Sequence, residues 1–299
     1  MVPKVFSGSS NKPLAEKVAK ILGLAISPLE IHVFPDGEKR VRVVESVVGL
    51  DTVVVQSAAA PVDENYMELF FIIDALRRSG AKSVTAVIPY LGYQRQDHVF
   101  REGEAVSLDV IIKALESLGA TKIVTFDLHS IKIPELFSIP VSHLSALPLF
   151  AEKIKKIANC SLVSPDMGGV RRIKIISGML GDLPYVTVVK NRDLTSGKIT
   201  AEKIEGRVLR KAIIVDDMIS SGKTVVAAAD LLRKNGAQEI IVMATHAVLS
   251  GDSPEALQNS IISKVVVTDT IEISKEKHFA KLEVLSAADI IAGELATSR

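Results

Sequence analysis

The sequence is poor in the features that mark secreted, membrane-spanning and nucleic-acid-binding proteins. It has one cysteine, Cys160, no tryptophan, and an aromatic fraction of only 4%. One cysteine excludes an internal disulfide framework and is typical of a reducing compartment, and the apolar run after Cys160 predicts a buried side chain. A net charge of +1 gives no electrostatic reason to expect nucleic acid or an acidic membrane as a partner.

Long hydrophobic runs are also missing. No apolar run approaches the ~20 residues that a membrane-spanning helix needs, and the first residues contain no signal-peptide core. We therefore expect a cytoplasmic protein without a membrane partner. The 299 residues, 47% of them hydrophobic and 24% charged, are enough for two globular domains.

What is present is an alternation of helix and strand patterns. In three places a helix pattern ends in glycine (Gly80, Gly119 and Gly236), a polar turn follows, and a strand rich in β-branched residues begins. This alternation predicts an α/β fold with largely parallel sheets flanked by helices. The prolines between residues 140 and 148 break the pattern, so we predict domains over residues 1–142 and 143–285 and a closing helix over 286–299.

The chain is organised around residues 211–235. The run 212–215 predicts a strand buried on both faces, and Asp216 and Asp217 follow where that strand is expected to leave the sheet. A turn of small and hydroxyl-bearing residues then opens a helix rich in alanine and leucine: Ser220, Ser221, Gly222, Lys223 and Thr224.

The N–H groups of such a turn suit a phosphate, and two carboxylates suit a vicinal diol or Mg²⁺. A sugar phosphate carries both a phosphate and a diol. A nucleotide P-loop is excluded, because the glycine that this motif requires five residues before Gly222 is Asp217. A plain turn with a helix cap remains the alternative for the acidic pair.

More polar residues follow other predicted strands, where ligands bind in open α/β sheets. They are Arg95 and Gln96 after the strand 84–88, Asp127 and His129 after 122–126, Asp166 after 161–163, and Lys190 and Arg192 after 185–189. We expect the last pair to open a polar loop that continues to residue 199. Each cluster alone is compatible with a solvated loop, but all of them at strand ends favour a functional site.

Phe34 precedes the turn Pro35-Asp36-Gly37-Glu38, which lies between predicted strands at 31–34 and 41–44. Periodicity alone favours an ordinary turn beside a core aromatic residue. The functional alternative is that Phe34 stacks on a base while the two carboxylates accept hydrogen bonds from amino or hydroxyl groups.

Seven motifs, in order and over nearly the whole length, resemble the ribose-phosphate pyrophosphokinase family. They lie at residues 34–38, 61–69, 89–97, 127–129, 164–169, 190–192 and 215–224. Type I phosphoribosyltransferases would share only the last of them. Two departures from the family pattern are visible: Lys223 stands where a small residue is usual, and Gln94 where alanine is common.

The resemblance implies a Mg²⁺-dependent transfer of the pyrophosphoryl group of ATP to the 1-hydroxyl of ribose 5-phosphate. It implies two similar domains of the type I phosphoribosyltransferase kind, with the ATP-binding side in the first and the ribose 5-phosphate loop in the second. It also implies a homo-oligomer, a dimer or a multiple of dimers, in which the 34–38 tip completes the ATP site of the neighbouring subunit.

The family pattern assigns roles to residues of this chain. ATP would be held by Phe34, Asp36, Gly37, Glu38, Arg95 and Gln96, and the metal by His129 and Asp166. Lys190 and Arg192 would act at the reacting phosphates. The sugar phosphate would be held by Arg192, Asp216, Asp217, Ser220, Ser221, Gly222, Lys223 and Thr224.

Two alternative functions remain, a type I phosphoribosyltransferase and a non-catalytic regulatory homologue. A transferase needs no ATP site, so residues 34–38 and 95–97 count against it. A regulatory homologue would be expected to have lost Lys190, Arg192 or Asp216, and all three are present.

Overall fold

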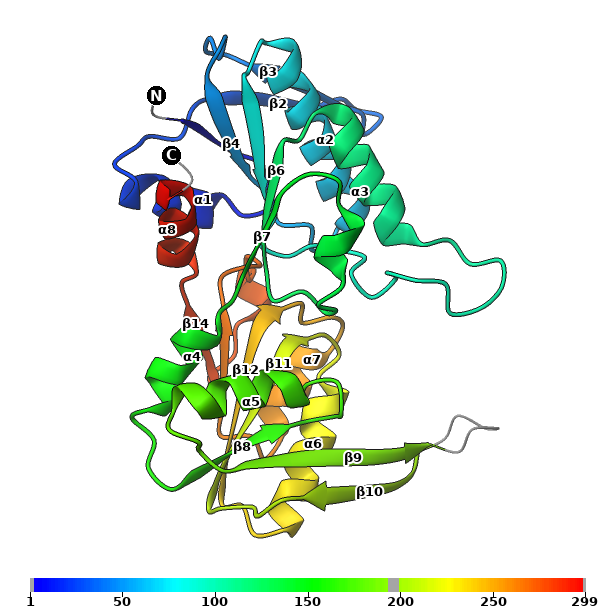
Figure 1. Cartoon of the computed structure of the whole chain (residues 1–299), viewed down its shortest axis with the longest axis vertical. Coiled ribbons are helices and arrows are strands. Elements are labelled where there is room, and N and C mark those ends of the chain that lie inside the picture. The colour runs from blue at the N-terminus through cyan, green and yellow to red at the C-terminus, as the bar shows by residue number, and fades with distance from the viewer. Residues whose placement is uncertain (1–2, 193–198, 298–299) are drawn as a thin grey trace. The chain divides into compact units, whose positions relative to one another are not determined.

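A computed structural model describes residues 3–192 and 199–297, which form two compact units. The first unit contains residues 1–144, 270–272 and 286–299, and the second contains residues 145–269 and 273–285. Each unit is an α/β structure built on its own sheet (Figure 1). The α/β prediction is therefore confirmed.

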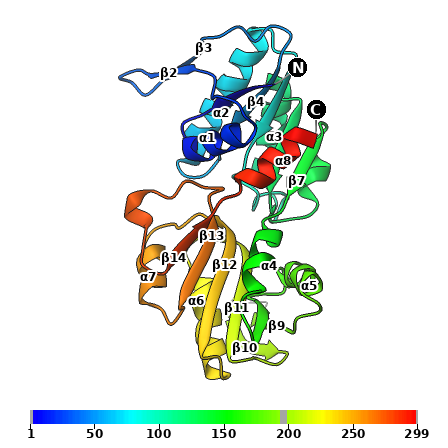
Figure 2. The same cartoon turned by 90° about the vertical axis from the view of Figure 1, so that its left-hand side faces the viewer.

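The sheet of the first unit has five parallel strands in the order β1-β4-β5-β6-β7. The strands are β1 (Lys4–Ser7), β4 (Asp51–Val55), β5 (Ser83–Val87), β6 (Lys122–Phe126) and β7 (Val141–Leu144). A separate antiparallel hairpin joins β2 (Leu29–Val33) to β3 (Lys39–Val43) and extends away from this sheet (Figure 2).

Helices cover both faces of this sheet. The four α-helices are α1 (Lys12–Ile21), α2 (Val62–Arg78), α3 (Ser107–Leu118) and α8 (Ala288–Thr297), with a short 3₁₀ turn, η1, at Ile133–Leu136. On β4, Val54 packs in a core with α2 and α3, whereas Val53 and Val55 pack in a second core with α1 and α8. This alternation explains why parallel strands read as continuous apolar runs. Figure 2 shows α1 and α8 side by side on their face.

The sheet of the second unit has seven strands in the order β10-β9-β8-β11-β12-β13-β14, parallel except for the β9–β10 pair. The strands are β8 (Cys160–Ser164), β9 (Tyr185–Arg192), β10 (Ile199–Glu205), β11 (Lys211–Ile219), β12 (Glu239–Ala247), β13 (Lys264–Thr268) and β14 (Leu282–Leu285). The helices are α4 (Leu147–Ile154), α5 (Val170–Met179), α6 (Lys223–Lys234) and α7 (Ser253–Asn259), with a 3₁₀ turn, η2, at Lys275–Lys277.

The central strand β11 is buried on both faces, as its sequence predicts. Ile213 and Val215 belong to a core with α4 and α5, and Ala212 and Ile214 belong to a core with α6. Cys160 is also buried, with 1% of its surface exposed.

The three glycine-terminated helices end in the same way. Gly80, Gly119 and Gly236 have φ of +85°, +106° and +99°, a left-handed conformation that glycine adopts without steric cost. In each case the alanine after the glycine donates its N–H to a carbonyl in the last turn of the helix: Ala81 to Leu76, Ala120 to Leu115 and Ala237 to Leu232, at 3.0–3.1 Å. The hydrogen bond closes a Schellman cap and turns the chain into the next strand.

Within residues 3–192 and 199–297, no helix has the length and hydropathy that crossing a membrane requires.

Candidate active site

The acidic pair lies within β11 rather than beyond its end. Asp216 is paired with Ala244 of β12, and the ladder continues to Ile219. On the other side the ladder with β8 stops at Ile214. The prediction that both carboxylates stand where the strand leaves the sheet is therefore wrong on the β12 side, because β12 is long enough to pair with β11 past the acidic residues.

Arg172 of α5 holds the two carboxylates. Its Nη1 lies 3.1 Å from Asp216 Oδ1, and its Nη2 lies 3.4 Å from Asp217 Oδ1. The three side chains are 15%, 15% and 6% exposed, so water screens these interactions only weakly. Sequence reasoning missed Arg172. The available signal was an arginine in the first turn of a helix that follows Gly168 and Gly169.

The surroundings of the acidic pair shift the pKa of Asp216 upward. Burial raises the pKa of Asp216 well above its ordinary value of 3.8, and the charge of Asp217 and a hydrogen bond with it raise it further. The nearby charge of Asp166 acts in the same direction, whereas Arg172 lowers this pKa. The oxygens of the two carboxyl groups can accept hydrogen bonds from a hydroxyl-rich ligand.

The predicted phosphate turn is present immediately after β11. Gly222 has φ of +75°, and α6 begins at Lys223. Among the described residues, no side chain caps this helix start, so its first-turn N–H groups can donate to a bound anion. Ser220 fixes the turn, since its carbonyl accepts from the Ser250 N–H at 3.1 Å and the two hydroxyl oxygens are also 3.1 Å apart.

Asp166 follows β8 and is held by its own loop. Its Oδ1 accepts the Gly169 N–H at 3.0 Å, and its carbonyl accepts the Ser164 hydroxyl at 2.7 Å. A Cβ atom at position 169 would lie 2.6 Å from Ser164 Oγ, which explains the glycine there. The charge of Asp166 is one of the causes of the raised pKa of Asp216.

Lys190 and Arg192 lie in an antiparallel hairpin (Figure 1). We expected them after a strand that ends at residue 189, but β9 continues to Arg192 and pairs with β10. The pairing of Asn191 with Ala201 accounts for the difference. Their side chains, and residues 193–198 of the expected loop, lie outside the described part of the chain.

In the first unit, the tip of the β2–β3 hairpin is a tight turn. The Phe34 N–H donates to the Glu38 carbonyl at 2.8 Å, the Glu38 N–H donates to Asp36 Oδ1 at 3.1 Å, and Gly37 has φ of +90°. Phe34 is 37% exposed, and the Arg40 guanidinium lies 5.8 Å from the centre of its ring. Phe34 is thus not the core residue that periodicity alone favours.

A buried ion pair anchors this hairpin. Lys39, the first residue after the tip, donates to Glu68 of α2 at 2.9 Å, and Glu68 is 1% exposed. The other oxygen of Glu68 accepts from the Ser9 N–H at 2.7 Å and the Gln56 amide at 3.1 Å. Burial alone would raise the pKa of Glu68, but the hydrogen bonds and the Lys39 charge outweigh it, so the pKa lies below its ordinary value of 4.5.

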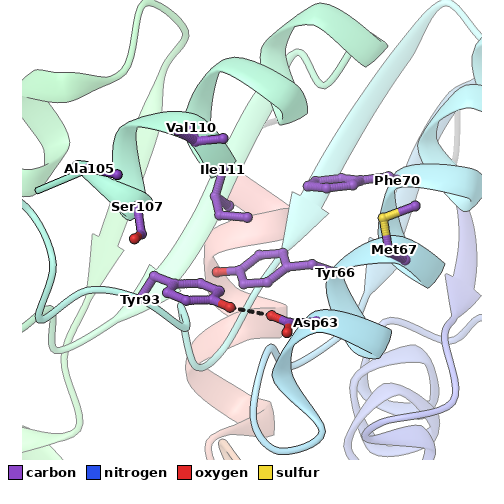
Figure 3. Close-up of a pocket in the computed structure, with 9 residues that line it drawn as sticks. All are labelled: Asp63, Tyr66, Met67, Phe70, Tyr93, Ala105, Ser107, Val110 and Ile111. Atoms are coloured by element: carbon purple, nitrogen blue, oxygen red, sulfur yellow. Dashed lines mark hydrogen bonds between the residues drawn. The ribbon is translucent and has the colours of Figure 1, made fainter.

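Arg95 and Gln96 follow closely after Tyr93, which is one of the residues that line a cavity of about 280 Å³ (Figure 3). The turn is closed by the Gln96 N–H, which donates to the Tyr93 carbonyl at 2.8 Å. Tyr93 faces the cavity, and its hydroxyl donates to Asp63 of α2. The cavity is lined by Asp63, Tyr66, Met67, Phe70, Tyr93, Ala105, Ser107, Val110 and Ile111.

His129 lies after β6, as predicted, on a loop that is held by hydrogen bonds. Its N–H donates to Gln94 Oε1 at 2.8 Å, and the neighbouring Leu128 N–H donates to His143 Nε2 of β7 at 2.9 Å. The predicted site residues therefore form two groups. The first unit carries residues 34–38, 95, 96 and 129, and the second carries residues 166, 190, 192, 216, 217 and 220–224.

Comparison with known proteins assigns the chain to a family. A sequence model of the N-terminal domain of ribose phosphate pyrophosphokinase matches residues 3–119, and one of the phosphoribosyl synthetase-associated domain matches residues 194–296. Ribose-phosphate pyrophosphokinase from Bacillus cereus is 39% identical over 293 residues, with 96% of this chain and 91% of the relative covered.

The corresponding enzyme from Aquifex aeolicus is 40% identical over 292 residues, with 96% and 93% covered. The crystal structure of phosphoribosylpyrophosphate synthetase from Mycobacterium smegmatis matches with a TM-score of 0.93 and 35% identity, covering 100% of this chain and 99% of that one. The chain belongs to the ribose-phosphate pyrophosphokinase family.

Proposed function

We propose that this protein makes 5-phosphoribosyl 1-pyrophosphate and AMP from ribose 5-phosphate and ATP. The 1-hydroxyl oxygen of the sugar attacks the β-phosphorus of ATP, and the bond from that phosphorus to the α–β bridging oxygen breaks. AMP leaves with the bridging oxygen, and the hydroxyl proton passes to solvent. The observation that carries the proposal is the buried acidic pair of β11 followed directly by the uncapped start of α6, in a chain of this family.

The second unit supplies the sugar-phosphate side. Asp216 and Asp217 would bind the ribose hydroxyls, and residues 220–224 would direct N–H groups at the 5-phosphate. Lys223, which begins α6, adds a cation next to that phosphate. Arg192 would also contact the sugar phosphate.

The first unit supplies the nucleotide side. An exposed aromatic ring beside the carboxylates of Asp36 and Glu38 suits a base with amino groups, and Arg95 and Gln96 would contact the phosphates and the base. Gly37 has the positive φ that the tight tip requires. We further propose a homo-oligomer in which this tip serves the ATP site of a neighbouring subunit, in the cytoplasm.

Lys190 and Arg192 would neutralise charge on the reacting phosphates. Pyrophosphoryl transfer needs little covalent chemistry from the protein, so positioning and charge stabilisation dominate its catalysis. Two cations that are two residues apart on β9 can act together on the non-bridging oxygens.

Mg²⁺ fits the oxygen-rich donors of this chain. Mg²⁺ is usually held by one or two carboxylates together with substrate phosphates, not by a complete protein cage. Asp166 keeps one carboxylate oxygen beyond its hydrogen bond to Gly169 and would hold the ion, and the family pattern also assigns His129 to the metal. When bound, the ion offsets phosphate charge. Among the described residues, no three His, Cys, Asp or Glu side chains gather as a preformed metal site.

The decisive experiment is incubation of the purified protein with ATP, Mg²⁺ and ribose 5-phosphate. The expected products are AMP and 5-phosphoribosyl 1-pyrophosphate in equal amounts, with no ADP. A phosphoribosyltransferase would instead consume 5-phosphoribosyl 1-pyrophosphate only when a base is added. A regulatory homologue would give no turnover with either substrate set.

A further inference from the structure

Gln94 joins two loops that carry different parts of the proposed site. It directly precedes Arg95, and its side chain is 1% exposed. Its Oε1 accepts the N–H of His129, 35 residues further along the chain, at 2.8 Å. The alanine that is common at this position in the resembled family has no group that could make this hydrogen bond.

Within the described part of the chain, only the oxygen of the Gln94 side-chain amide makes a hydrogen bond. Because the partner at His129 is an N–H donor, the oxygen of the amide must face it, and this fixes the orientation of Nε2. In the described part of the chain, Nε2 is buried and has no hydrogen-bond partner. Burying a donor without a partner lowers the stability of the folded protein. A glutamine at this position is therefore unfavourable for stability unless its hydrogen bond to His129 serves the function.

Each of the two loops also has attachments of its own to neighbouring elements. The turn that carries Arg95 and Gln96 is held on α2 through the Tyr93 hydroxyl and Asp63. The loop that carries His129 is held on β7 through the Leu128 N–H and His143. Gln94 adds a direct connection between the turn and the loop, and so fixes the distance between their backbones.

We propose that Gln94 is a positioning residue that holds the His129 loop in register with the Arg95–Gln96 turn. The inference rests on the proposed function, in which His129 serves the metal and Arg95 and Gln96 serve ATP. Loss of this hydrogen bond should weaken the binding of both Mg²⁺ and ATP. Binding of ribose 5-phosphate, which depends on the second unit, should be unaffected.

Two substitutions separate the hydrogen bond from packing. Gln94→Ala removes both the acceptor and the side-chain volume, whereas Gln94→Met keeps a similar volume without the acceptor. Thr125→Val is the matched control, because Thr125 Oγ1 is another buried polar atom without a partner in the described chain, on β6 beside the same loop. It should leave all kinetic constants within about twofold.

Both Gln94 variants should raise the KM for ATP and the Mg²⁺ concentration for half activity by roughly fivefold, the effect of about one hydrogen bond. The KM for ribose 5-phosphate should stay the same. Hydrogen exchange of the His129 amide, followed by mass spectrometry without substrates, should accelerate by a similar factor in both variants and not in Thr125→Val.

Three results would overturn the proposal. Wild-type behaviour of Gln94→Met would show that only packing matters. Equal losses for both substrates together with a lower melting temperature would show a general structural role, and unchanged exchange at His129 would show that the bond does not hold the loop. If the wild-type protein forms no AMP, the proposed function fails, and calorimetric titration with Mg²⁺ and ATP together with the exchange data still decides the role of Gln94.

Discussion

Replacing Arg172 by methionine tests whether the acidic pair of β11 depends on a single cation. The substitution keeps much of the side-chain volume but leaves two buried carboxylates without their positive partner. Removing one member of a buried ion pair typically costs about 3–5 kcal/mol. Arg172 is 15% exposed and its contact with Asp217 is 3.4 Å long, so we expect the lower end, about 3 kcal/mol.

Such a loss should lower the melting temperature by roughly 10 °C for a unit of this size. Because the chain has no tryptophan, far-UV circular dichroism is the suitable probe. Arg78→Met is the matched control, since Arg78 pairs with Asp74 on the surface of α2 with 79% of its side chain exposed. That substitution should change the free energy of unfolding by less than about 0.5 kcal/mol.

The double variant Arg172→Met/Asp216→Asn completes the cycle. Asparagine can still accept the Asp217 N–H that Asp216 Oδ1 accepts at 2.9 Å, but it carries no charge. The double variant should therefore recover at least about half of the lost stability. The reasoning is refuted if Arg172→Met melts within about 2 °C of wild type, or if the two substitutions are simply additive.

Four further predictions follow from the site. Lys190→Ala should lower kcat by more than about a hundredfold with little change in KM, as loss of one preorganised charge does; a KM effect with kcat intact would mean that the lysine only binds substrate. Asp216→Ala should weaken ribose 5-phosphate much more than ATP in steady-state kinetics, and equal losses would indicate a metal role instead. Phe34→Ala and Asp216→Ala should each be nearly inactive but regain activity when co-expressed, because mixed oligomers contain one site with an intact tip and an intact sugar loop; purified mixed oligomers without activity would exclude a shared site. Glu68, with its lowered pKa, contributes stability that is present above its ordinary value of 4.5 and is lost as the pH falls below it, so Glu68→Gln should flatten the acid limb of urea unfolding midpoints, and an unchanged limb would contradict this.

Local signals in the sequence were sufficient for the cores and the caps. The helix ends at Gly80, Gly119 and Gly236 depend on residues within one turn of each glycine, so their pattern identifies them. Four branched or small apolar residues in a row predict strand β11, because a strand that is buried on both faces has a continuous apolar sequence.

The features that the sequence does not predict depend on pairing with another segment of the chain. Arg172 and Asp216 are 44 residues apart in the sequence, and no local pattern predicts a contact between them. The extension of β11 through the acidic residues depends on the length of β12, and that of β9 depends on pairing with β10. The Gln94–His129 bond is of the same kind: Gln94 was noticed only as a departure from a family pattern, and its partner became visible with the fold.

The position of α8 has a consequence for how the protein is made. Ala288, Ile291, Ala292 and Leu295 are at most 6% exposed and complete a core that also contains α1. A ribosome that adds about 5–20 residues per second synthesises the whole of the second unit after β7 and before α8. The first unit, although most of it is synthesised first, therefore keeps an unfinished apolar face until α8 is made. Chaperones and proteases that act on the growing chain should meet the N-terminal unit with this face still open.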